Sequence, residues 1–306
     1  MASGCCSPAT SSATGSTATI ESSRPFAIES KTASRAGMVK IPAGPFSMGT
    51  NNALAYPADH EGPKRTVDLD EFWIDETTVT NDSFATFVSS TGYVTEAERA
   101  GWSFVPSFLL APEDKEHLVG AAADTPWWVG VKQTDWRHPL GPSSTIQELQ
   151  SHPVVHISWN DANAFAQWSG KRLPTEAEWE KAARGGLENS LYAWGDELLL
   201  NGQHACNIWQ GDFPISNSAE DGFLGTAPAQ SFEPNGYGLY NLCGNVWEWC
   251  QDSWGDSLPD ENKVIKGGSF MCHDSYCNRY RLSARTSHAK NAFTAHIGFR
   301  CVSDNK

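Results

Sequence analysis

Lys266–Arg281 reads KGGSFMCHDSYCNRYR and is the most informative stretch of the chain. Cys272 and Cys277 stand five positions apart in it, with His273 between them. This spacing differs from the C-x-x-C of zinc knuckles and thioredoxin-like sites, and no second Cys/His pair follows at the distance needed to complete a zinc tetrahedron. A structural zinc site is therefore poorly supported.

Basic residues and glycines surround the two cysteines. Three arginines follow closely: Arg279, Arg281 and Arg285. The positive charge of an arginine lowers the pKa of a nearby thiol. Gly267 and Gly268 allow the backbone to approach whatever binds there. Such a pair suits a redox dithiol or a soft ion such as Cu(I). Two free cysteines buried in the core remain the alternative on composition alone.

The other cysteines do not suggest a disulfide framework. The chain has eight, and the remaining ones are Cys5, Cys6, Cys206, Cys243, Cys250 and Cys301. Most lie in the last third of the sequence, whereas a framework spreads through a small secreted domain. We therefore expect free buried thiols as the default for Cys206, Cys243 and Cys250.

Charge and hydropathy narrow the class of protein. The chain has 306 residues, 40% of them apolar, and a formal net charge of −14. A negative surface without a Lys/Arg cluster argues against nucleic acid and anionic membranes as partners. No apolar run reaches the roughly 18 to 20 residues of a membrane-spanning helix, and the N-terminus shows no signal-peptide pattern. The composition is typical of a soluble globular protein.

The chain divides into a tail and one domain. Residues 1–37 are rich in Ser, Thr and Ala, which predicts a disordered tail, and residues 38–306 predict a single α+β domain with much irregular backbone. Helices are predicted from Asn81 to Gly92, from Asn160 or Asp161 to Gly170, and from Pro174 to Gly185, the last opened by a capping box of Thr175 and Glu178. Strands are predicted at Thr66–Leu69, Pro153–Ile157 and Val264–Lys266.

Several motifs together resemble one enzyme family. Besides the cysteine stretch they are IPAGPFSMG (Ile41–Gly49), HPVVHISWND (His152–Asp161), KRLPTEAEWE (Lys171–Glu180), GNVWEW (Gly244–Trp249) and GFRC (Gly298–Cys301). The chain resembles the formylglycine-generating enzymes, also called sulfatase-modifying factors, from about Met38 to Val302. The resemblance implies a C-type-lectin-like fold, and it is the paired cysteines that separate the enzymes from non-catalytic members of the wider superfamily.

The resemblance implies an oxidoreductase that activates sulfatases. Such an enzyme converts a cysteine within Cys-x-Pro-x-Arg of an unfolded sulfatase polypeptide to Cα-formylglycine, using O2 and a reducing thiol. The family's active pair corresponds to Cys272 and Cys277, which would hold Cu(I), with the substrate cysteine as a third sulfur ligand. By the same resemblance Ser269, Trp247 and Tyr276 line the catalytic pocket.

Two structural calcium sites are also implied by the resemblance. Their ligands carry over to Asn207, Ile208, Asp221 and Phe223 for the first ion and to Asn241, Gly244, Val246 and Glu248 for the second. A hard cation with many oxygen ligands suits loops whose carbonyls lack strand partners. The alternative for these Asn and Asp residues is that they form Asx turns.

The chain departs from secreted members of the family. Of the family's two disulfides it keeps only Cys301, whose partner position is Ala166, while the second pair falls on Ala183 and Leu282. We therefore expect a reducing, cytoplasmic location and a monomer. His296 replaces an asparagine of some relatives near the active pair.

Three rival functions fit parts of the sequence. A sulfoxide synthase needs a facial iron site of the type His-x-x-x-His-x-Glu, but here His152 and His156 are followed by Ser158. A non-catalytic paralogue that binds unfolded sulfatase polypeptide has no need of both cysteines. A copper-independent oxidase that cycles Cys272 and Cys277 through a disulfide stays open.

Overall fold

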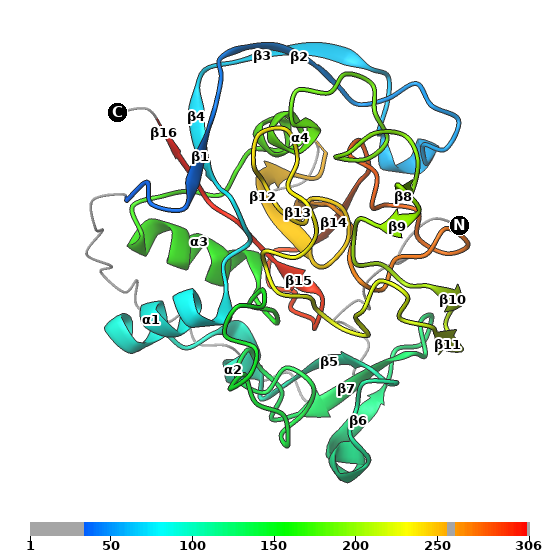
Figure 1. The fold of residues 1–306 in the computed structure, drawn as a ribbon. Helices are drawn as coiled ribbons and strands as arrows, with labels where there is room; N and C mark the ends of the chain where they lie inside the picture. The colour runs from blue at the N-terminus through cyan, green and yellow to red at the C-terminus, as the bar shows by residue number, and fades with distance from the viewer. Residues whose placement is uncertain (1–33, 256–260, 305–306) are drawn as a thin grey trace.

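Helices account for little of the chain. The computed structural model describes residues 34–255 and 261–304, so most of the predicted tail, residues 1–33, lies outside the described residues. The α-helices are α1 (Asn81–Thr91), α2 (Glu96–Ala100), α3 (Trp159–Trp168) and α4 (Glu176–Arg184), and the 3-10 helices are η2 (Pro57–Asp59) and η3 (Pro112–His117). Figure 1 shows long irregular connections between them.

Hydrogen bonds from capping side chains start each α-helix. At α4 the predicted capping box is present: the Thr175 hydroxyl accepts from the Glu178 N–H, and the Glu178 carboxylate accepts from the Thr175 N–H. The N-cap of α1 is Thr80, one residue before the predicted start. In α3 the cap is Ser158, and Asp161 completes its box from inside the helix. The sequence analysis did not predict α2, which begins with the same device.

A mixed sheet at the centre of the domain carries the loop that holds the cysteine pair. It contains β12 (Trp247–Ser253), β13 (Asn262–Lys266), β14 (Arg285–Ala289) and β15 (Ile297–Gly298) in the order β14-β13-β12-β15. β12 pairs parallel to β15 and antiparallel to β13. The connection from β13 to β14 contains Cys272 and Cys277, so both ends of this connection are fixed by adjacent strands.

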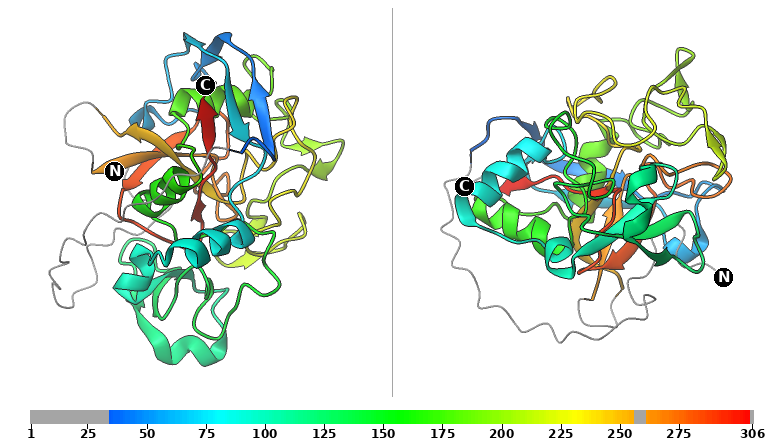
Figure 2. Two further views of the ribbon diagram at one scale, coloured as in Figure 1. Left: turned by 90° about the vertical axis from the view of Figure 1, so that its left-hand side faces the viewer. Right: turned by 90° about the horizontal axis from the view of Figure 1, so that it is seen from below.

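Smaller sheets surround this centre. They are β1-β4-β16, made of Met38–Ile41, Phe72–Asp75 and Val302–Asp304; β2-β3, made of Gly44–Met48 and Arg65–Leu69; β5-β7-β6, made of Trp102–Pro106, Trp128–Lys132 and Leu118–Ala121; β8-β9, made of Leu199–Leu200 and Gln203–His204; and β10-β11, made of Gly211–Asp212 and Ser216–Asn217. The β2-β3 ribbon and the β5-β7-β6 sheet lie at opposite ends of the molecule (Figures 1 and 2).

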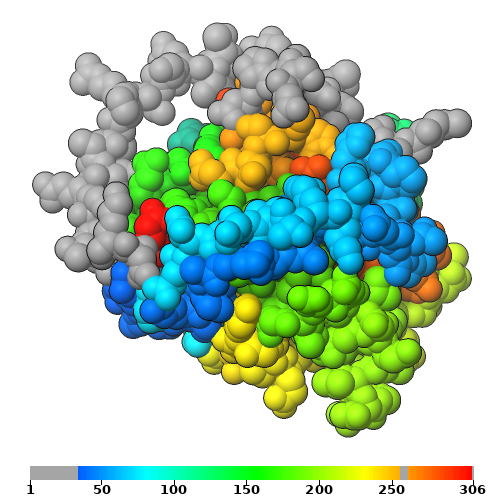
Figure 3. Space-filling model, turned by 90° about the horizontal axis from the view of Figure 1, so that it is seen from above, coloured from blue at the N-terminus to red at the C-terminus, as the bar shows by residue number. Residues whose placement is uncertain are grey.

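The segment after β1 crosses the domain and contacts α4. Figure 3 shows the blue and cyan N-terminal chain lying across the top face. The Lys181 ammonium donates to the Gly44 carbonyl at 2.7 Å, and the Gly49 N–H donates to the Glu180 carboxylate at 2.7 Å. Glu180 also accepts from the Lys266 ammonium at 3.0 Å, so the loop after β2 lies beside the start of the connection that carries the two cysteines.

The core and the fold class agree with the sequence analysis, apart from one strand. A single large apolar cluster includes Trp179, Trp247 and Trp249, all fully buried, and the α+β fold is confirmed. The strand predicted at Pro153–Ile157 is wrong: apart from an isolated bridge at Pro153, this segment is irregular, because His156 has a φ of 60°. No helix among the described residues has the length and apolar character needed to cross a membrane.

Candidate active site and metal sites

Two thiols lie in contact at the centre of the domain. The sulfur atoms of Cys272 and Cys277 are 3.2 Å apart, and the residues are 1% and 0% exposed. Both are in the reduced form, because a disulfide bond is about 2.05 Å long. Two sulfurs this close can bind one soft ion or form a disulfide after a small movement. The donor set therefore fits Cu(I).

A tight backbone crossing forms the turn that brings the sulfurs together. Gly268 has a φ of 73°, and a Cβ there would lie 2.9 Å from the Tyr280 Cα, so a side chain does not fit. The Cys272 N–H donates to the Ser269 carbonyl, and the Cys277 N–H donates to the His273 carbonyl. The chain on either side of the pair is thus drawn together.

Ser269, one of the predicted site residues, contacts the pair directly. Its backbone N–H points at the Cys272 sulfur at 3.3 Å, and the residue is fully buried. Its hydroxyl accepts from the Met271 N–H at 3.3 Å. A backbone donor aimed at sulfur favours the thiolate over the thiol. Ser269 therefore contacts the cysteine pair through its backbone N–H, and its hydroxyl stabilises the turn.

Trp247 lies in the same apolar cluster as the two cysteines. It is fully buried at the start of β12, and its backbone N–H donates to the His296 carbonyl at 2.9 Å. Its indole Nε1 is buried and has no hydrogen-bond partner among the described residues. The ring of His296, the residue that replaces an asparagine of some relatives, lies 4.5 Å from the ring of Trp128. His296 is therefore part of the buried region next to Trp247.

Tyr276 belongs to an aromatic group that the sequence analysis missed. Its ring stacks on Phe213 at 4.6 Å and meets Trp127 edge-on at 5.1 Å. Phe213 also contacts Trp209, whose backbone N–H donates to the Cys272 carbonyl at 3.0 Å. The high tryptophan content was visible in the sequence, but no local pattern links residues from three separate loops. This group forms an apolar wall next to the thiols.

The three arginines that follow the pair are each matched by a carboxylate. The pairs are Arg279–Asp59 at 2.5 Å, Arg281–Glu61 at 2.6 Å and Arg285–Glu176 at 2.7 Å. Their positive charges are therefore compensated close by. Each guanidinium ties the chain after Cys277 to a distant part of the domain.

The first predicted calcium set is assembled around Asp221. Its carboxylate accepts from the Ile208 N–H at 3.0 Å and, in the expected Asx turn, from the Phe223 N–H at 2.9 Å. The Asn207 Oδ1 is buried and has no hydrogen-bond partner among the described residues. Burial raises the pKa of Asp221, since the charged form of the carboxyl loses its hydration. The Gln210 amide donates to the Asp221 carboxylate at 2.8 Å and to the Ile208 carbonyl, so it contacts two members of this set. The oxygens of the set are of the type that a hard cation takes, and a bound ion would replace this amide.

The second predicted calcium set fits only in part. The Asn241 Oδ1 is buried and has no hydrogen-bond partner among the described residues. The Glu248 carboxylate, however, accepts from the Trp179 indole at 2.8 Å and from the Arg300 guanidinium at 2.7 and 2.8 Å. Because Glu248 already has a compensating cation, its charge is not left for calcium. Gly244 and Val246 offer backbone carbonyls alone.

Four other cysteines of the described residues and His156 lie outside the cysteine pair. Burial raises the pKa of the thiols of Cys206, Cys250 and Cys301, and it raises that of Cys243 to about 12. A raised pKa favours the protonated thiol, which is the weaker nucleophile and metal ligand. His156 accepts from the Ser103 hydroxyl and donates to a backbone carbonyl, so neither ring nitrogen is left for iron.

Comparisons with known proteins find similar sequences and a similar fold. A sequence model of the sulfatase-modifying factor enzyme 1-like domain matches residues 25–305. The formylglycine-generating enzyme of Thermomonospora curvata is 53% identical over 284 residues, covering 88% of this chain and 93% of the relative. The inactive C-alpha-formylglycine-generating enzyme 2 of Bos taurus is 43% identical and covers 87% of each chain. The structure of PvdO from Pseudomonas aeruginosa shares the fold, with a TM-score of 0.62 and 23% identity over 88% of this chain and 94% of that one.

Proposed function

The chain belongs to the sulfatase-modifying factor family, and on this premise we propose that it converts a cysteine of a sulfatase Cys-x-Pro-x-Arg motif to Cα-formylglycine. The observation that carries the proposal is the contact of two reduced, buried thiols, Cys272 and Cys277, at 3.2 Å. Conversion of the substrate thiol to an aldehyde breaks the C–S bond, takes its oxygen from water, releases hydrogen sulfide and removes two electrons from the substrate. O2 accepts four electrons on reduction to water, so the oxidation of two thiol groups of the reductant to a disulfide supplies the other two.

In the proposed reaction Cys272 and Cys277 hold Cu(I), and the ion, when bound, supplies redox chemistry with O2. The backbone N–H of Ser269 stabilises the Cys272 thiolate. Trp247 and the ring of Tyr276 exclude water and shape the surface against which the unfolded polypeptide is held. The chain's own contribution is therefore to fix two soft donors in a dry site.

Calcium at the first set is proposed as a structural ligand. The support is the buried Asn207 oxygen, which has no hydrogen-bond partner among the described residues, together with the buried Asp221 carboxylate, whose partner Gln210 the ion would replace. In the second set Asn241 offers an oxygen, but the Glu248–Arg300 pair makes that site the weaker fit. We also propose a monomer and a reducing, cytoplasmic location; the support for the location is that none of the cysteines in the described part of the chain forms a disulfide.

A non-catalytic role is the second candidate, because the inactive Bos taurus relative is also similar over most of its length. In that case the pocket would bind unfolded polypeptide without oxidising it. The contact between Cys272 and Cys277 favours the enzyme, since binding alone does not require two adjacent thiols.

Mass spectrometry of a Cys-x-Pro-x-Arg peptide tests the choice. The peptide is incubated aerobically with the protein and a reducing thiol, with and without added Cu(I). We expect the cysteine to become an aldehyde only with Cu(I). Conversion without copper would favour the dithiol mechanism. If the folded protein binds the peptide and leaves it unchanged in both arms, the enzymatic proposal is wrong.

A further inference from the structure

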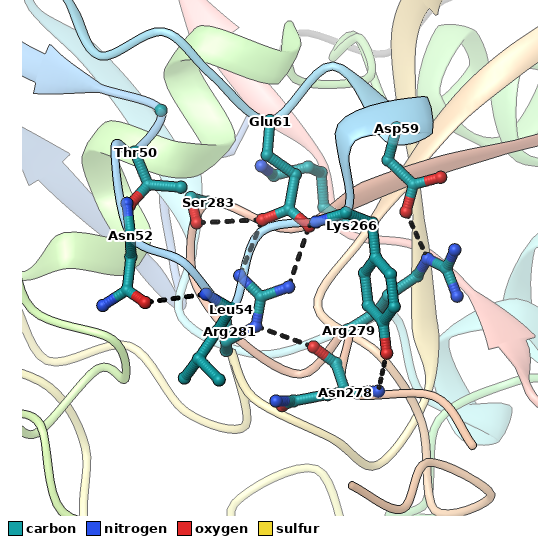
Figure 4. Close-up of polar contacts among 12 residues, drawn as sticks. Thr50, Asn52, Leu54, Asp59, Glu61, Lys266, Asn278, Arg279, Arg281 and Ser283 are labelled. Atoms are coloured by element: carbon teal, nitrogen blue, oxygen red, sulfur yellow. Dashed lines mark hydrogen bonds and ion pairs between the residues drawn. The ribbon is translucent and has the colours of Figure 1, made fainter. Parts of the chain in front are cut away.

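A loop from the N-terminal part of the domain forms hydrogen bonds and ion pairs with the residues directly after Cys277. We define the anchor loop as residues 50–61, which contain η2 (Figure 4). Its partners are residues 278–283, more than 200 positions later in the chain. Neither the sequence motifs nor the proposed chemistry assigns this loop a role.

Hydrogen bonds within the anchor loop fix its backbone. The Asn52 N–H donates to the Thr50 hydroxyl at 3.0 Å, and the Leu54 N–H donates to the Asn52 side chain at 2.9 Å. Figure 4 shows the second of these contacts. The Tyr56 N–H donates to the Glu61 carboxylate at 2.9 Å, and the Thr50 N–H to the Glu61 carbonyl at 3.1 Å. Its side chains are thus presented from a fixed frame.

The first contact is with the residue next to Cys277. The backbone N–H of Asn278 donates to the Tyr56 hydroxyl at 3.0 Å. A hydrogen bond to the peptide unit that joins Cys277 to Asn278 restricts the position of the Cys277 Cα. Tyr56 therefore acts on the cysteine through the backbone without touching its sulfur.

Two ion pairs hold the next residues. The Arg281 guanidinium forms two parallel hydrogen bonds to Glu61, at 2.6 and 2.8 Å, and both side chains are fully buried. The Arg279 Nε donates to the Asp59 carboxylate at 2.5 Å. Figure 4 shows Asp59 and Glu61 reaching the two arginines from the same loop. The Tyr56 ring lies 4.2 Å from the Arg279 guanidinium and 5.7 Å from that of Arg281.

Cys272 is held from another side. Its carbonyl accepts from the Trp209 N–H at 3.0 Å, and the Phe270 N–H just before it donates to the Asn245 carbonyl at 2.9 Å. Apart from the hydrogen bond from Cys277 to the His273 carbonyl within the turn, the backbone at each cysteine is therefore held by a different part of the domain. A change in the anchor loop should act first on Cys277, because the loop contacts the residues that follow it.

We infer that Tyr56 and Asp59 of the anchor loop are positioning residues that set the place of Cys277 relative to Cys272. The expected effect on catalysis rests on the proposed function. The positioning of Cys277 by the loop does not depend on that function. Near-attack geometry is sensitive to displacements of about 1 Å, which can cost about a hundredfold in rate. The loop would then act on turnover more than on substrate binding.

Tyr56→Phe is the test variant, because it removes the hydroxyl and keeps the ring between the arginines. Tyr93→Phe is the matched control, since it removes a hydroxyl that donates to the Asp161 carboxylate at 2.9 Å away from the anchor loop. Asp59→Asn is a second, independent variant that keeps the size of the side chain. The melting temperature of each variant shows whether it folds.

Two readouts are compared with the parent protein. The first is the rate of alkylation of each cysteine by iodoacetamide without copper, followed by mass spectrometry. We expect Tyr56→Phe to speed alkylation of Cys277 relative to Cys272, and Tyr93→Phe to leave this ratio unchanged. The second is peptide turnover, for which we expect kcat to fall about tenfold or more while KM stays within about twofold.

The outcomes separate this inference from the proposed function. An unchanged alkylation ratio in both Tyr56→Phe and Asp59→Asn overturns the positioning of Cys277 by the loop. An altered ratio with parental kcat overturns its part in turnover. If the parent itself converts no peptide, the proposed function fails, and the alkylation ratio still decides whether the loop positions Cys277.

Discussion

Glu248 and Arg300 form a bidentate ion pair in the interior of the domain, with side chains that are 1% and 0% exposed. Arg300 also donates to the backbone carbonyls of Asp75, Glu76 and Tyr240. A single buried pair thus joins the central sheet to the end of β4 and to the irregular segment at Tyr240. Since buried charges are costly without a partner, this pair should be far more sensitive to loss of one member than a surface pair.

Glu248→Gln should therefore strongly destabilise the fold. It leaves the Arg300 charge buried and uncompensated, and we expect a loss of about 3 to 5 kcal/mol in the free energy of unfolding. Urea denaturation measures the effect. Lys40→Met is the control, because the Lys40–Glu71 pair is exposed and should contribute less than about 1 kcal/mol. Equal losses for the two variants would contradict the assigned role of the pair.

Cys272→Ser and Cys277→Ser should each abolish peptide conversion and copper retention. The substitution keeps the volume of the side chain and removes the soft ligand, so the melting temperature should change little. Cys250→Ala is the control, since this buried thiol of β12 lies outside the proposed machinery. Turnover at the parental rate by either serine variant would rule out the two-thiol copper site.

Removal of calcium should lower the thermal stability. A ligand present at a hundred times its Kd stabilises the native state by about 2.7 kcal/mol, which chelation removes. Asp221→Asn should reduce this dependence, whereas Asp212→Asn, an exposed carboxylate of the nearby hairpin, should not. Calorimetry with and without chelator makes the comparison. The calcium assignment fails if the melting temperature of the parent does not respond.

Acid should destabilise the fold through two buried histidines. Burial lowers the pKa of His156 and of His288 from 6.5 to about 4, so each remains neutral in the folded state. Between pH 6.5 and 4 the unfolded chain binds more protons, and stability present above pH 6.5 is lost as the pH falls through this range.

The contribution of His156 can be isolated by substitution. His156→Asn suits the positive φ of this position and should make the pH dependence between 6.5 and 4 shallower by up to about 1.4 kcal/mol per pH unit. Urea denaturation at a series of pH values measures the slope, and values above pH 7 give each protein its own reference. A slope equal to that of the parent would show that His156 does not take up a proton on unfolding.

Local features of the fold were predictable from the sequence. The capping box of Thr175 and Glu178 and the glycine after α4 act within a few residues of one another, so their pattern is readable directly. The segment at His156 was wrongly predicted as a strand, because Val154, Val155 and Ile157 are residue types typical of strands, whereas here they are buried in an irregular loop. The paired cysteines and the family to which the chain belongs were also readable from short motifs.

The sequence by itself determined the two thiols, their neighbours in the motif and the ends of the helices. These features depend on residues that are close together in the chain. Only the tertiary structure decided how they are held. Tyr56 and Asp59 meet Asn278 and Arg279 across more than 200 positions, and no local periodicity encodes such a contact. The fold alone brings the anchor loop to the residue after Cys277. A buried charge requires a partner of opposite charge, and here the packed domain provides that partner from a distant part of the chain.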